Sequence, residues 1–394
     1  MTIALSSLLA TGVPPLDAAA TAAADARQAQ LTKPAGSMGR LESLGSRLAG
    51  MYAVCPPPIP EPAVVAVFAG DHGVHAQGVS PWPQEVTVQM VANVAAGGAV
   101  VNALARQVGA SVCVIDVGVA GPPVFADDRG GRYTRAGVAD AAVGDLLHAD
   151  AMPPSTYRAA LGAGAAAVAA RLASGPLRAL VIGEMGIGNT TCAAAVTAAL
   201  TDATGADLDA VVGRGTGIDD ATWARKRDVV AAAVARVRPF VAADPDAAGH
   251  RALAALGGRE LAAMVGAMAH AIERDVIVLV DGYIASAAAL ALCTIAPAAA
   301  AGLVFGHQSR EPGHQRVLAA LRAQPGDAIH ARPLLDLDLA LGEASGALLA
   351  FELLDAACCL HDRMATFAEA AVPDRAVGPP AAAGVTTRPP RSRV

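Results

Sequence analysis

The feature that most restricts the fold of this chain is a set of short, continuous apolar runs rich in valine, isoleucine and leucine. These runs lie at Val64–Ala69, Val112–Val117, Leu180–Gly183, Val276–Val280 and Leu303–Phe305. Strands that are buried on both faces read as continuous apolar runs, whereas strands with one solvated face alternate. The pattern therefore predicts a parallel sheet with helices on both of its faces.

Long alanine-rich segments separate these runs. We expect helices over Val86–Val108, Tyr157–Ala173, Trp223–Val241 and Arg259–Ala271. Strands that alternate with helices predict an α/β protein with right-handed crossovers. Hydrophobic residues make up 54% of the 394 residues and charged residues 16%. That composition supplies a sizeable core and excludes disorder over the whole length.

The two ends of the chain have a different pattern. Near the N-terminus, Asp17–Gln30 and Leu41–Met51 read as helices, and the prolines of Cys55–Pro60 separate them from the first strand. Near the C-terminus, Ser345–Phe367 reads as one or two helices. We expect these terminal helices to pack together as a small domain beside the sheet.

The expected division of the chain has four parts. Residues 1–60 form the N-terminal helical part of the small domain, and 61–332 form the large α/β domain. Residues 333–372 supply an active-site loop and the C-terminal helices of the small domain. After Pro373 the chain is rich in proline, alanine and arginine, so we expect 373–394 to be a disordered tail.

Charge and cysteine usage narrow the function classes. The net charge of −6 offers no basic stripe for a nucleic-acid backbone. The first basic residue is Arg27, which argues against a secretory leader. Six cysteines without a C-x-x-C pair indicate free, buried thiols in a reducing, cytoplasmic compartment, and no zinc site. Tyr283–Phe305 is uncharged and reaches the ~20 residues that a bilayer needs, but it contains Pro297 and Gly302, and we expect a buried helix, a turn and a strand.

Glycine and polar residues follow each of the five predicted strands. In a parallel sheet these carboxyl ends share one edge, where ligands bind. For any single strand end, turn formation or helix capping is a sufficient explanation. Five such ends together predict one shared pocket. The segments are Gly70-Asp71-His72-Gly73, Asp116-Val117-Gly118, Gly183–Thr191, Asp281-Gly282 and Gly306-His307-Gln308-Ser309.

Two glycine-containing segments suggest anion binding. Gly186, Gly188, Asn189 and Thr190 precede an alanine-rich helix whose first N–H groups can hold a phosphate. The glycine spacing matches neither a Walker loop nor a dinucleotide fingerprint. Gly213-Arg214-Gly215-Thr216-Gly217 is followed by the basic cluster Arg225-Lys226-Arg227, which can grip a phosphate or simply face solvent.

Glu343 stands in Leu341-Gly342-Glu343-Ala344-Ser345-Gly346, beside a predicted helix start. A partly desolvated carboxylate there can have a raised pKa and serve as a general base, and a plain capping role is equally compatible with the residues. His72 and His75 are poorly spaced for a metal pair and lack a third ligand. His307 and His314 flank Glu311, which indicates substrate hydrogen bonding or a turn.

Taken in order, these motifs resemble the nicotinate-nucleotide–dimethylbenzimidazole phosphoribosyltransferase family over roughly residues 30 to 365. The first and third matching segments are long and distinctive. Two places depart from the family pattern, namely extra residues around Gln324–Asp327 and the sequence Trp82-Pro83-Gln84. The matching segments are Leu31–Glu42, Ala69–Val74 with Gly78–Ser80, Glu184–Thr191, Gly213–Gly217, Asp281-Gly282, Gly306-His307 with Ser309 and Glu311, and Leu341–Glu343.

The resemblance implies a Rossmann-like sheet, a small helical domain built from both termini, a homodimer, and no cofactor or metal. The implied reaction transfers the phosphoribosyl group of nicotinate mononucleotide to 5,6-dimethylbenzimidazole, giving α-ribazole 5′-phosphate and nicotinate for the nucleotide loop of cobalamin. Glu343 matches the catalytic base. Ser80, Gln89 and Leu341 match the benzimidazole pocket, and positions near the nucleotide or product are matched by Glu184, Gly186, Gly215, Thr216, Lys226 and Ser309.

Gly188, Asn189, Thr190 and Asp281 complete the expected substrate-binding set, because they follow strands at the same edge. Two rival functions remain open at this point. One is a phosphoribosyltransferase for another aromatic base, such as a purine or a phenolic compound, since a flat apolar pocket accepts several rings. The other is a non-catalytic protein that senses a nucleotide.

Overall fold

The computed structural model describes residues 15–141, 143–324 and 331–373. It divides into two compact units, a larger one over Pro60–Glu352 and a smaller one that combines Leu16–Ile59 with the chain from Leu353 onward. The division falls inside helix α13 (Ser345–Arg363). Residues 333–352, which we expected to supply the active-site loop and the start of the C-terminal helices, fall in the larger unit by this division, and the four-part division itself stays a prediction.

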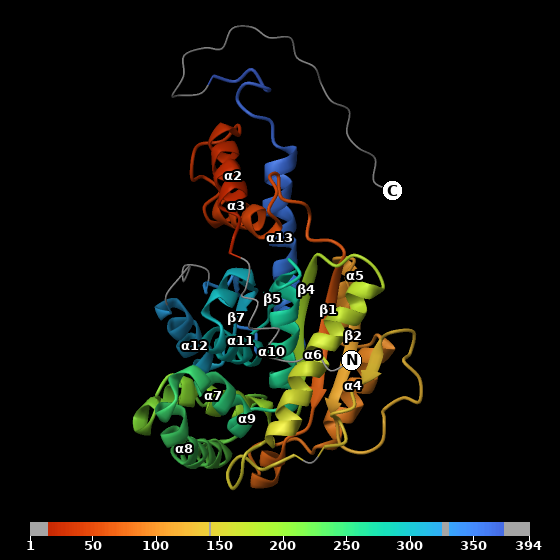
Figure 1. Cartoon of the computed structure of the whole chain (residues 1–394), viewed down its shortest axis with the longest axis vertical. Helices are drawn as coiled ribbons and strands as arrows, with labels where there is room; N and C mark the ends of the chain where they lie inside the picture. The colour runs from red at the N-terminus through yellow and green to blue at the C-terminus, as the bar shows by residue number, and fades with distance from the viewer. Residues whose placement is uncertain (1–14, 142, 325–330, 374–394) are drawn as a thin grey trace. The chain divides into compact units, whose positions relative to one another are not determined.

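The larger unit is built on a six-stranded parallel sheet of order β3-β2-β1-β4-β5-β6 (Figure 1). This confirms the predicted α/β class, and the five predicted strands all form. The sequence pattern missed β3, a short edge strand in which only Tyr133 is buried. The strands are β1 (Ala63–Gly70), β2 (Ser111–Gly118), β3 (Tyr133–Arg135), β4 (Ala179–Met185), β5 (Ile277–Val280) and β6 (Leu303–Phe305).

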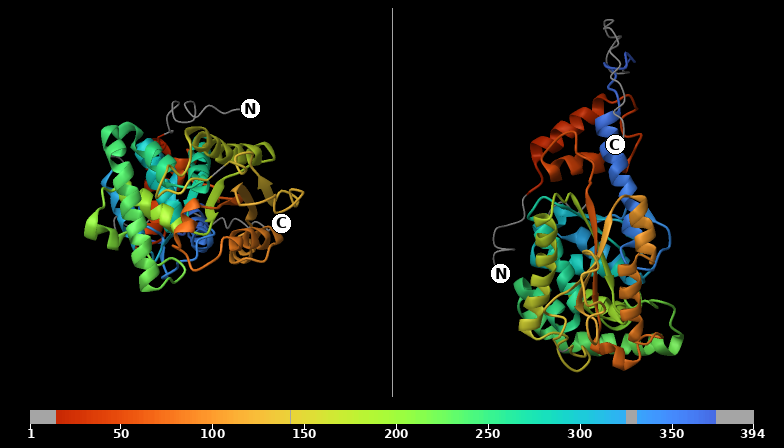
Figure 2. Two further views of the ribbon diagram at one scale, coloured as in Figure 1. Left: turned by 90° about the horizontal axis from the view of Figure 1, so that it is seen from below. Right: turned by 90° about the vertical axis from the view of Figure 1, so that its right-hand side faces the viewer.

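Helices cover both faces of this sheet (Figure 2). On one face lie α4 (Glu85–Ala96) and α5 (Val100–Gln107). On the other lie α6 (Pro154–Ala173) and α10 (Arg259–Ile272). Every residue of β1, β5 and β6 is buried, as a doubly covered parallel sheet requires.

The predicted helix over Val86–Val108 is two helices, because the chain turns at Gly97. Gly97 has a φ of +89° and its N–H caps the carbonyls of Asn93 and Val94. The whole stretch Glu85–Gln107 is, within the described residues, long and apolar enough to cross a membrane by length and composition alone, although this break divides it. Tyr283–Phe305, the other apolar stretch, forms α11 (Tyr283–Ile295), a 3₁₀ turn η4 (Pro297–Gly302) and β6, as predicted.

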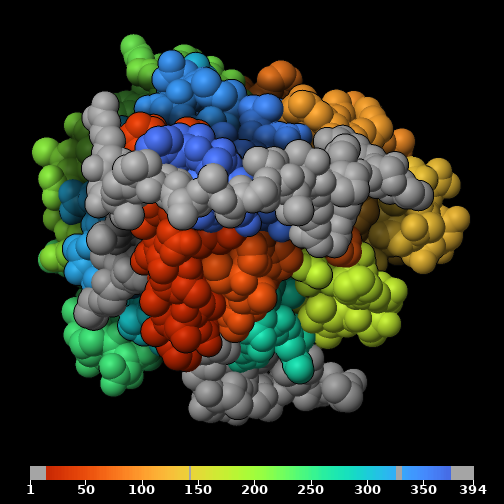
Figure 3. All heavy atoms as spheres, turned by 90° about the horizontal axis from the view of Figure 1, so that it is seen from above, coloured from red at the N-terminus to blue at the C-terminus, as the bar shows by residue number. Residues whose placement is uncertain are grey.

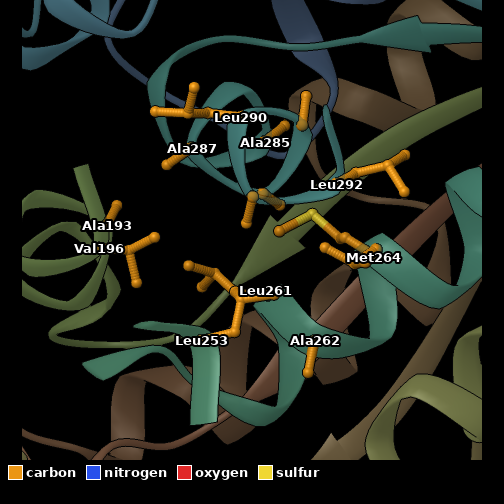
Figure 4. Packing of buried hydrophobic residues seen from close by; sticks show 14 of the residues in the cluster. Ala193, Val196, Leu253, Leu261, Ala262, Met264, Ala285, Ala287, Leu290 and Leu292 are labelled. Carbon is orange, nitrogen blue, oxygen red and sulfur yellow. The ribbon is translucent and has the colours of Figure 1, made fainter. Parts of the chain in front are cut away.

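Alanine and glycine bring the core helices unusually close. A methyl group on Gly164 of α6 would stand 1.8 Å from the Ala263 carbonyl oxygen, and one on Gly266 of α10 would stand 1.9 Å from that of Leu161. The two helices therefore pack backbone to backbone. Figure 4 shows the neighbouring layer, where small and branched side chains of α10 and α11 meet those of α7 (Asn189–Leu200).

The larger unit also contains a second, two-stranded sheet and several further helices. This second sheet pairs β7 (His307–Gln308) with β8 (Leu335–Asp336) and fixes where the segment toward Glu343 begins. Two-residue strands leave no periodic signal, so the sequence did not predict them. The other elements are η1 (Gly73–Gln77), η2 (Gly205–Ala210), α8 (Asp220–Ala243), η3 (Pro245–Ala247), α9 (Ala248–Leu256) and α12 (Pro312–Ala323).

The smaller unit contains α2 (Ala18–Gln30), α3 (Arg40–Tyr52) and the C-terminal part of α13, which lie side by side in Figure 3. The buried Gln28 amide lies 2.7 Å from the His361 ring, and the His361 ring occupies the space beside Gly45. The helix expected over Ser345–Phe367 ends at Arg363. The expected tail falls, apart from Pro373, outside the described residues. All six cysteines are free.

Candidate active site

A cavity of about 460 Å³ lies at the carboxyl ends of β4 and β5. Its walls come from α4, the Glu184–Thr190 segment, the glycine loop over 213–217, the start of α11, and the Ala340–Glu343 segment. These segments are far apart in the sequence, and the order of the parallel strands brings them to one edge. Three of the five predicted strand ends, those of β4, β5 and β6, meet at this cavity. The segments after β1 and β2 do not line it, and Asp71 and Asp116 instead accept hydrogen bonds from the N–H groups of Ala120 and Gly118.

Most of the predicted site residues line this cavity. Ser80, Gly188 and Lys226 do not: Ser80 accepts a hydrogen bond from the Trp82 N–H, Gly188 caps α7 with a φ of +96°, and Lys226 is buried behind the glycine loop. Substrate contact stays a prediction for these three residues and equally for those that line the cavity. The residues that do line the cavity are Gln89, Glu184, Gly186, Asn189, Thr190, Gly215, Thr216, Asp281, Ser309, Leu341 and Glu343.

Glu343 reaches the cavity through a strained turn. Gly342, Glu343 and Ala344 have φ values of +86°, +60° and +66°, and the last two are in a region that side chains rarely adopt. Gly183 of β4 permits this approach, because a methyl group there would stand 2.6 Å from the Ala344 nitrogen. A methyl group on Gly342 would stand 2.3 Å from Oε1 of Glu184. The turn is therefore wedged against β4 and brings the two carboxyl groups to one site.

Asp281 holds the helix that follows this turn. Its Oδ1 accepts a hydrogen bond of 2.8 Å from the Ala347 N–H in the first turn of α13, and it lies 3.4 Å from Nε2 of His307. The His307 ring fills the space beside Gly346. Burial lowers the pKa of His307, but the hydrogen bond to Asp281 and its charge raise it, and the net shift is upward. Asp281 thus fixes the start of α13 and, through it, the position of the turn that carries Glu343.

The cavity wall is acidic. Glu184, Asp281, Glu311 and Glu343 line it, and none of its described lining residues is Lys or Arg. Burial, followed by the charges of Asp281, Glu260 and Glu343, raises the pKa of Glu184 to about 8. Burial and the charge of Asp281 also raise the pKa of Glu343 above its usual 4.5. Such a wall favours a cationic reacting group, and the raised pKa makes the Glu343 carboxylate a stronger base than that of an exposed glutamate.

Lys226 is a buried cation beside the glycine loop. Its Nζ donates to Oγ1 of Thr190 and to the Gly213 carbonyl, each at 3.0 Å, and the side chain is 1% exposed. Burial lowers its pKa to about 8, although the Glu311 charge opposes that shift. Of the basic cluster considered from the sequence, Arg225 faces solvent while Lys226 points inward. Lys226 therefore ties the α7 start to the glycine loop.

Apolar side chains form another part of the cavity wall. They include Trp82, which sequence reasoning had treated only as a departure from the family pattern, together with Val86, Met90, Ile187 and Leu341. The Trp82 indole N–H donates to Oγ1 of Thr216 at 2.9 Å. This bond joins the loop before α4 to the glycine loop across the cavity. No local sequence pattern indicates the pairing, because the two residues are 134 positions apart.

Glu311 and His307 both line the cavity. Neither was among the expected substrate-binding residues, although His307 and His314 around Glu311 were considered for substrate hydrogen bonding or a turn. Their place in a matching segment after a strand end was the available signal. His314, which we expected to face substrate or form a turn, is fully buried: it accepts from the Ser309 N–H and lies 3.0 Å from Oγ of Ser286. Burial lowers the pKa of His314 to about 3, which leaves it neutral.

His72 is committed to a buried contact with two other groups. Its Nε2 lies 3.0 Å from Oε1 of Glu260, and its Nδ1 lies 3.2 Å from Sγ of Cys192 at the start of α7. In the described parts of the chain, no three His, Cys, Asp or Glu side chains are grouped to hold a metal ion. His72 therefore anchors the segment beneath Gly186 and Gly188.

Comparison with known proteins gives this site a context. A family model described as Phosphoribosyltransferase matches residues 13–372. The nicotinate-nucleotide–dimethylbenzimidazole phosphoribosyltransferase of Salinispora tropica is 49% identical over 367 residues, which cover 91% of this chain and 96% of that protein. The protein of the same name from Chloroflexus aurantiacus is 46% identical over 361 residues, covering 92% and 96%.

The fold comparison agrees with the sequence comparison. The crystal structure of the nicotinate-nucleotide–dimethylbenzimidazole phosphoribosyltransferase from Thermus thermophilus matches with a TM-score of 0.80 at 40% identity. The match covers 91% of this chain and all of that one. The chain belongs to the nicotinate-nucleotide–dimethylbenzimidazole phosphoribosyltransferase family.

Proposed function

We propose that this protein transfers the phosphoribosyl group of nicotinate mononucleotide to 5,6-dimethylbenzimidazole, giving α-ribazole 5′-phosphate and nicotinate in cobalamin nucleotide-loop assembly. The observation that carries the proposal is the position of Glu343. Its carboxyl group shares one cavity with an apolar wall, two glycine-containing segments and three further acidic side chains. The family membership and the curated relatives support the same reaction.

The chemistry of the substrates matches this wall. The pyridinium nitrogen of nicotinate mononucleotide is positive, so nicotinate is already an activated leaving group. As the C1′–N bond breaks, the ribose gains oxocarbenium character. A benzimidazole nitrogen attacks from the opposite face and inverts the anomeric centre from β to α. Because the departing ring takes the electron pair of the broken bond, the step needs no oxidant, and negative charges around the ribose stabilise its cationic character.

Glu343 serves as the general base in this proposal. When one benzimidazole nitrogen forms its bond to C1′, the proton on the other nitrogen becomes acidic, and the Glu343 carboxylate takes it. The raised pKa of Glu343 makes it a better proton acceptor than an exposed glutamate. The rigid turn at Gly342–Ala344 restricts the carboxylate to one approach, which reduces the entropy lost when two reactants are aligned.

The expected substrate positions follow from the two walls. We place the base against Val86, Met90 and Leu341, with Gln89 at its edge, and extend the pocket toward Ser80. We place the phosphate at the glycine loop, where Gly215, Thr216 and Thr190 line the cavity and Lys226 lies behind them. Asn189 donates a hydrogen bond to Glu184, which orients that side chain between the two substrates.

The direct test is incubation of the pure protein with nicotinate mononucleotide and dimethylbenzimidazole, with release of nicotinate followed by chromatography. Formation of α-ribazole 5′-phosphate supports the proposal. Nucleotide binding without nicotinate release would instead indicate a sensor, and release only with adenine or a phenol would indicate a different acceptor. A homodimer stays a prediction from the family resemblance, and a cytoplasmic location stays a prediction from the cysteine usage. Light scattering on the purified protein tests the first.

A further inference from the structure

Glu311 occupies an unusual position for the residue before a helix. It is the N-cap of α12, yet its side chain makes no cap to that helix. Its Oε1 instead accepts a hydrogen bond of 2.9 Å from the Gly215 N–H, 96 positions away. The side chain is 9% exposed, and Oε2 is buried without a hydrogen-bond partner. Burying a carboxylate costs hydration free energy. A hydrogen bond from the free N–H groups at the start of α12 would offset part of this cost, but Glu311 does not accept one there.

This carboxylate lies where an anionic ligand would be expected. Gly215 has a φ of +53°, and a methyl group on it would stand 3.3 Å from Oγ1 of Thr190 and 3.8 Å from Nζ of Lys226. A hydroxyl group and a buried ammonium group thus flank the residue whose N–H Glu311 occupies, and such a set of donors suits a phosphate. In this structure the N–H is taken by Glu311, whose charge also acts on Lys226.

A substrate phosphate and the Glu311 carboxylate cannot share this position, because two anions at contact distance repel each other strongly. A second cavity offers an alternative position for the displaced carboxylate. Glu311 also lines this cavity of about 640 Å³, which shares the glycine loop with the first. Arg310, Arg214 and Asp209 line the second cavity as well. Because Arg214 already pairs with Asp220, a side chain that turned toward this cavity would meet the Arg310 cation.

We propose that Glu311 is a specificity-determining residue whose carboxylate competes with a substrate phosphate for the Gly215 N–H, and that a phosphorylated nucleotide binds by displacing this carboxylate toward Arg310. The inference rests on the proposed function, since it assumes that such a nucleotide enters the cavity. Glu311 then keeps the glycine loop and Lys226 in place before substrate arrives. It also disfavours ligands that lack a phosphate, because only a strong anion can replace a carboxylate on the Gly215 N–H.

The test measures binding without turnover, by calorimetry on the full chain with nicotinate mononucleotide or inorganic phosphate and no acceptor base. Glu311→Gln keeps the size and the hydrogen-bond acceptor but removes the charge. Because a hydrogen bond to a neutral acceptor is weaker than one to a carboxylate, the variant should bind both ligands about fivefold more tightly. Arg310→Gln, which removes the group that receives the displaced carboxylate, should weaken binding of both.

Asp228→Asn is the matched control, because it removes one exposed carboxylate from α8 and should leave both affinities unchanged. Unchanged or weaker binding in Glu311→Gln would overturn the inference, as would equal tightening in Asp228→Asn. Weaker binding would mean that Glu311 contacts the ligand or merely braces the loop. Binding of inorganic phosphate reports on the displacement of Glu311 alone. If phosphate binds as expected but the enzyme releases no nicotinate, the result contradicts the proposed function and leaves this inference standing.

Discussion

The contact between β4 and the turn that carries Glu343 leads to a specific prediction for Gly183→Ala. The new methyl group would stand 2.6 Å from the Ala344 nitrogen and 2.8 Å from the Glu343 carbonyl carbon. Ordinary contact begins at 3.4 Å, so the turn must move away by about 0.8 Å. Because the methyl group would clash with backbone atoms of the turn, a change of side-chain rotamer cannot relieve the overlap.

A displacement of this size acts mainly on the chemical step. Misplacing a reacting group by ~1 Å costs roughly a hundredfold in rate, so we expect kcat to fall about that far. Overpacking should also reduce the free energy of unfolding by ~1–3 kcal/mol. The assay is nicotinate release at saturating substrates, together with thermal unfolding to establish that the variant is folded at the assay temperature.

Gly162→Ala provides the matched control. Gly162 lies in α6, a methyl group added to it would meet no heavy atom within 4 Å, and its φ is not positive. Its replacement should leave kcat unchanged and raise stability by ~0.5–1 kcal/mol, as expected for glycine in a helix. If Gly183→Ala retained the kcat of the wild type, the close packing of Gly183 against the Glu343–Ala344 backbone would not determine the position of Glu343.

Three further predictions concern the two walls and their charges. Trp82→Phe removes the hydrogen bond to Thr216 but keeps a ring, so the KM for the nucleotide should rise about two- to fivefold with kcat retained; Thr216→Val should add little to it in a double-mutant cycle. Lys226→Ala should raise the KM for the nucleotide far more than it lowers kcat, and an unchanged KM would remove Lys226 from the site. Because the pKa of Glu184 is raised to about 8, the folded protein keeps a proton that the unfolded chain releases between pH 4.5 and 8. The free energy of unfolding therefore decreases as pH rises through that window, by at most ~1.4 kcal/mol per pH unit. In thermal unfolding, the stability of Glu184→Gln relative to the wild type should increase steadily from pH 5 to 8. A difference that stays constant with pH would contradict the raised pKa.

The sheet and the meeting of its strand ends were predictable because both follow from a local pattern. Continuous apolar runs such as Val64–Ala69 need cover on both faces, and parallel strands place their carboxyl ends on one edge whatever the order of the strands. The positions of Glu184 and Asp281 at that edge followed directly. The family resemblance then singled out Glu343, which the residue pattern alone could not separate from a helix cap.

What the sequence did not predict depends on contacts between distant residues or on very short elements. The Trp82–Thr216 and Glu311–Gly215 hydrogen bonds join positions more than ninety residues apart, and neither leaves a periodic signal. The burial of Lys226 between two more exposed arginines depends on how α8 packs. The break at Gly97 inside an otherwise helical pattern follows from one left-handed glycine, which sequence alone allows but does not require.

The central claim is that Glu343 accepts a proton from the attacking base. The most direct test is Glu343→Gln, measured as single-turnover nicotinate release with dimethylbenzimidazole and as nucleotide affinity without it. The account predicts that turnover falls by about 10²–10⁴-fold, the usual contribution of a general base, while the affinity for nicotinate mononucleotide is retained. Release of nicotinate at the rate of the wild type would contradict it.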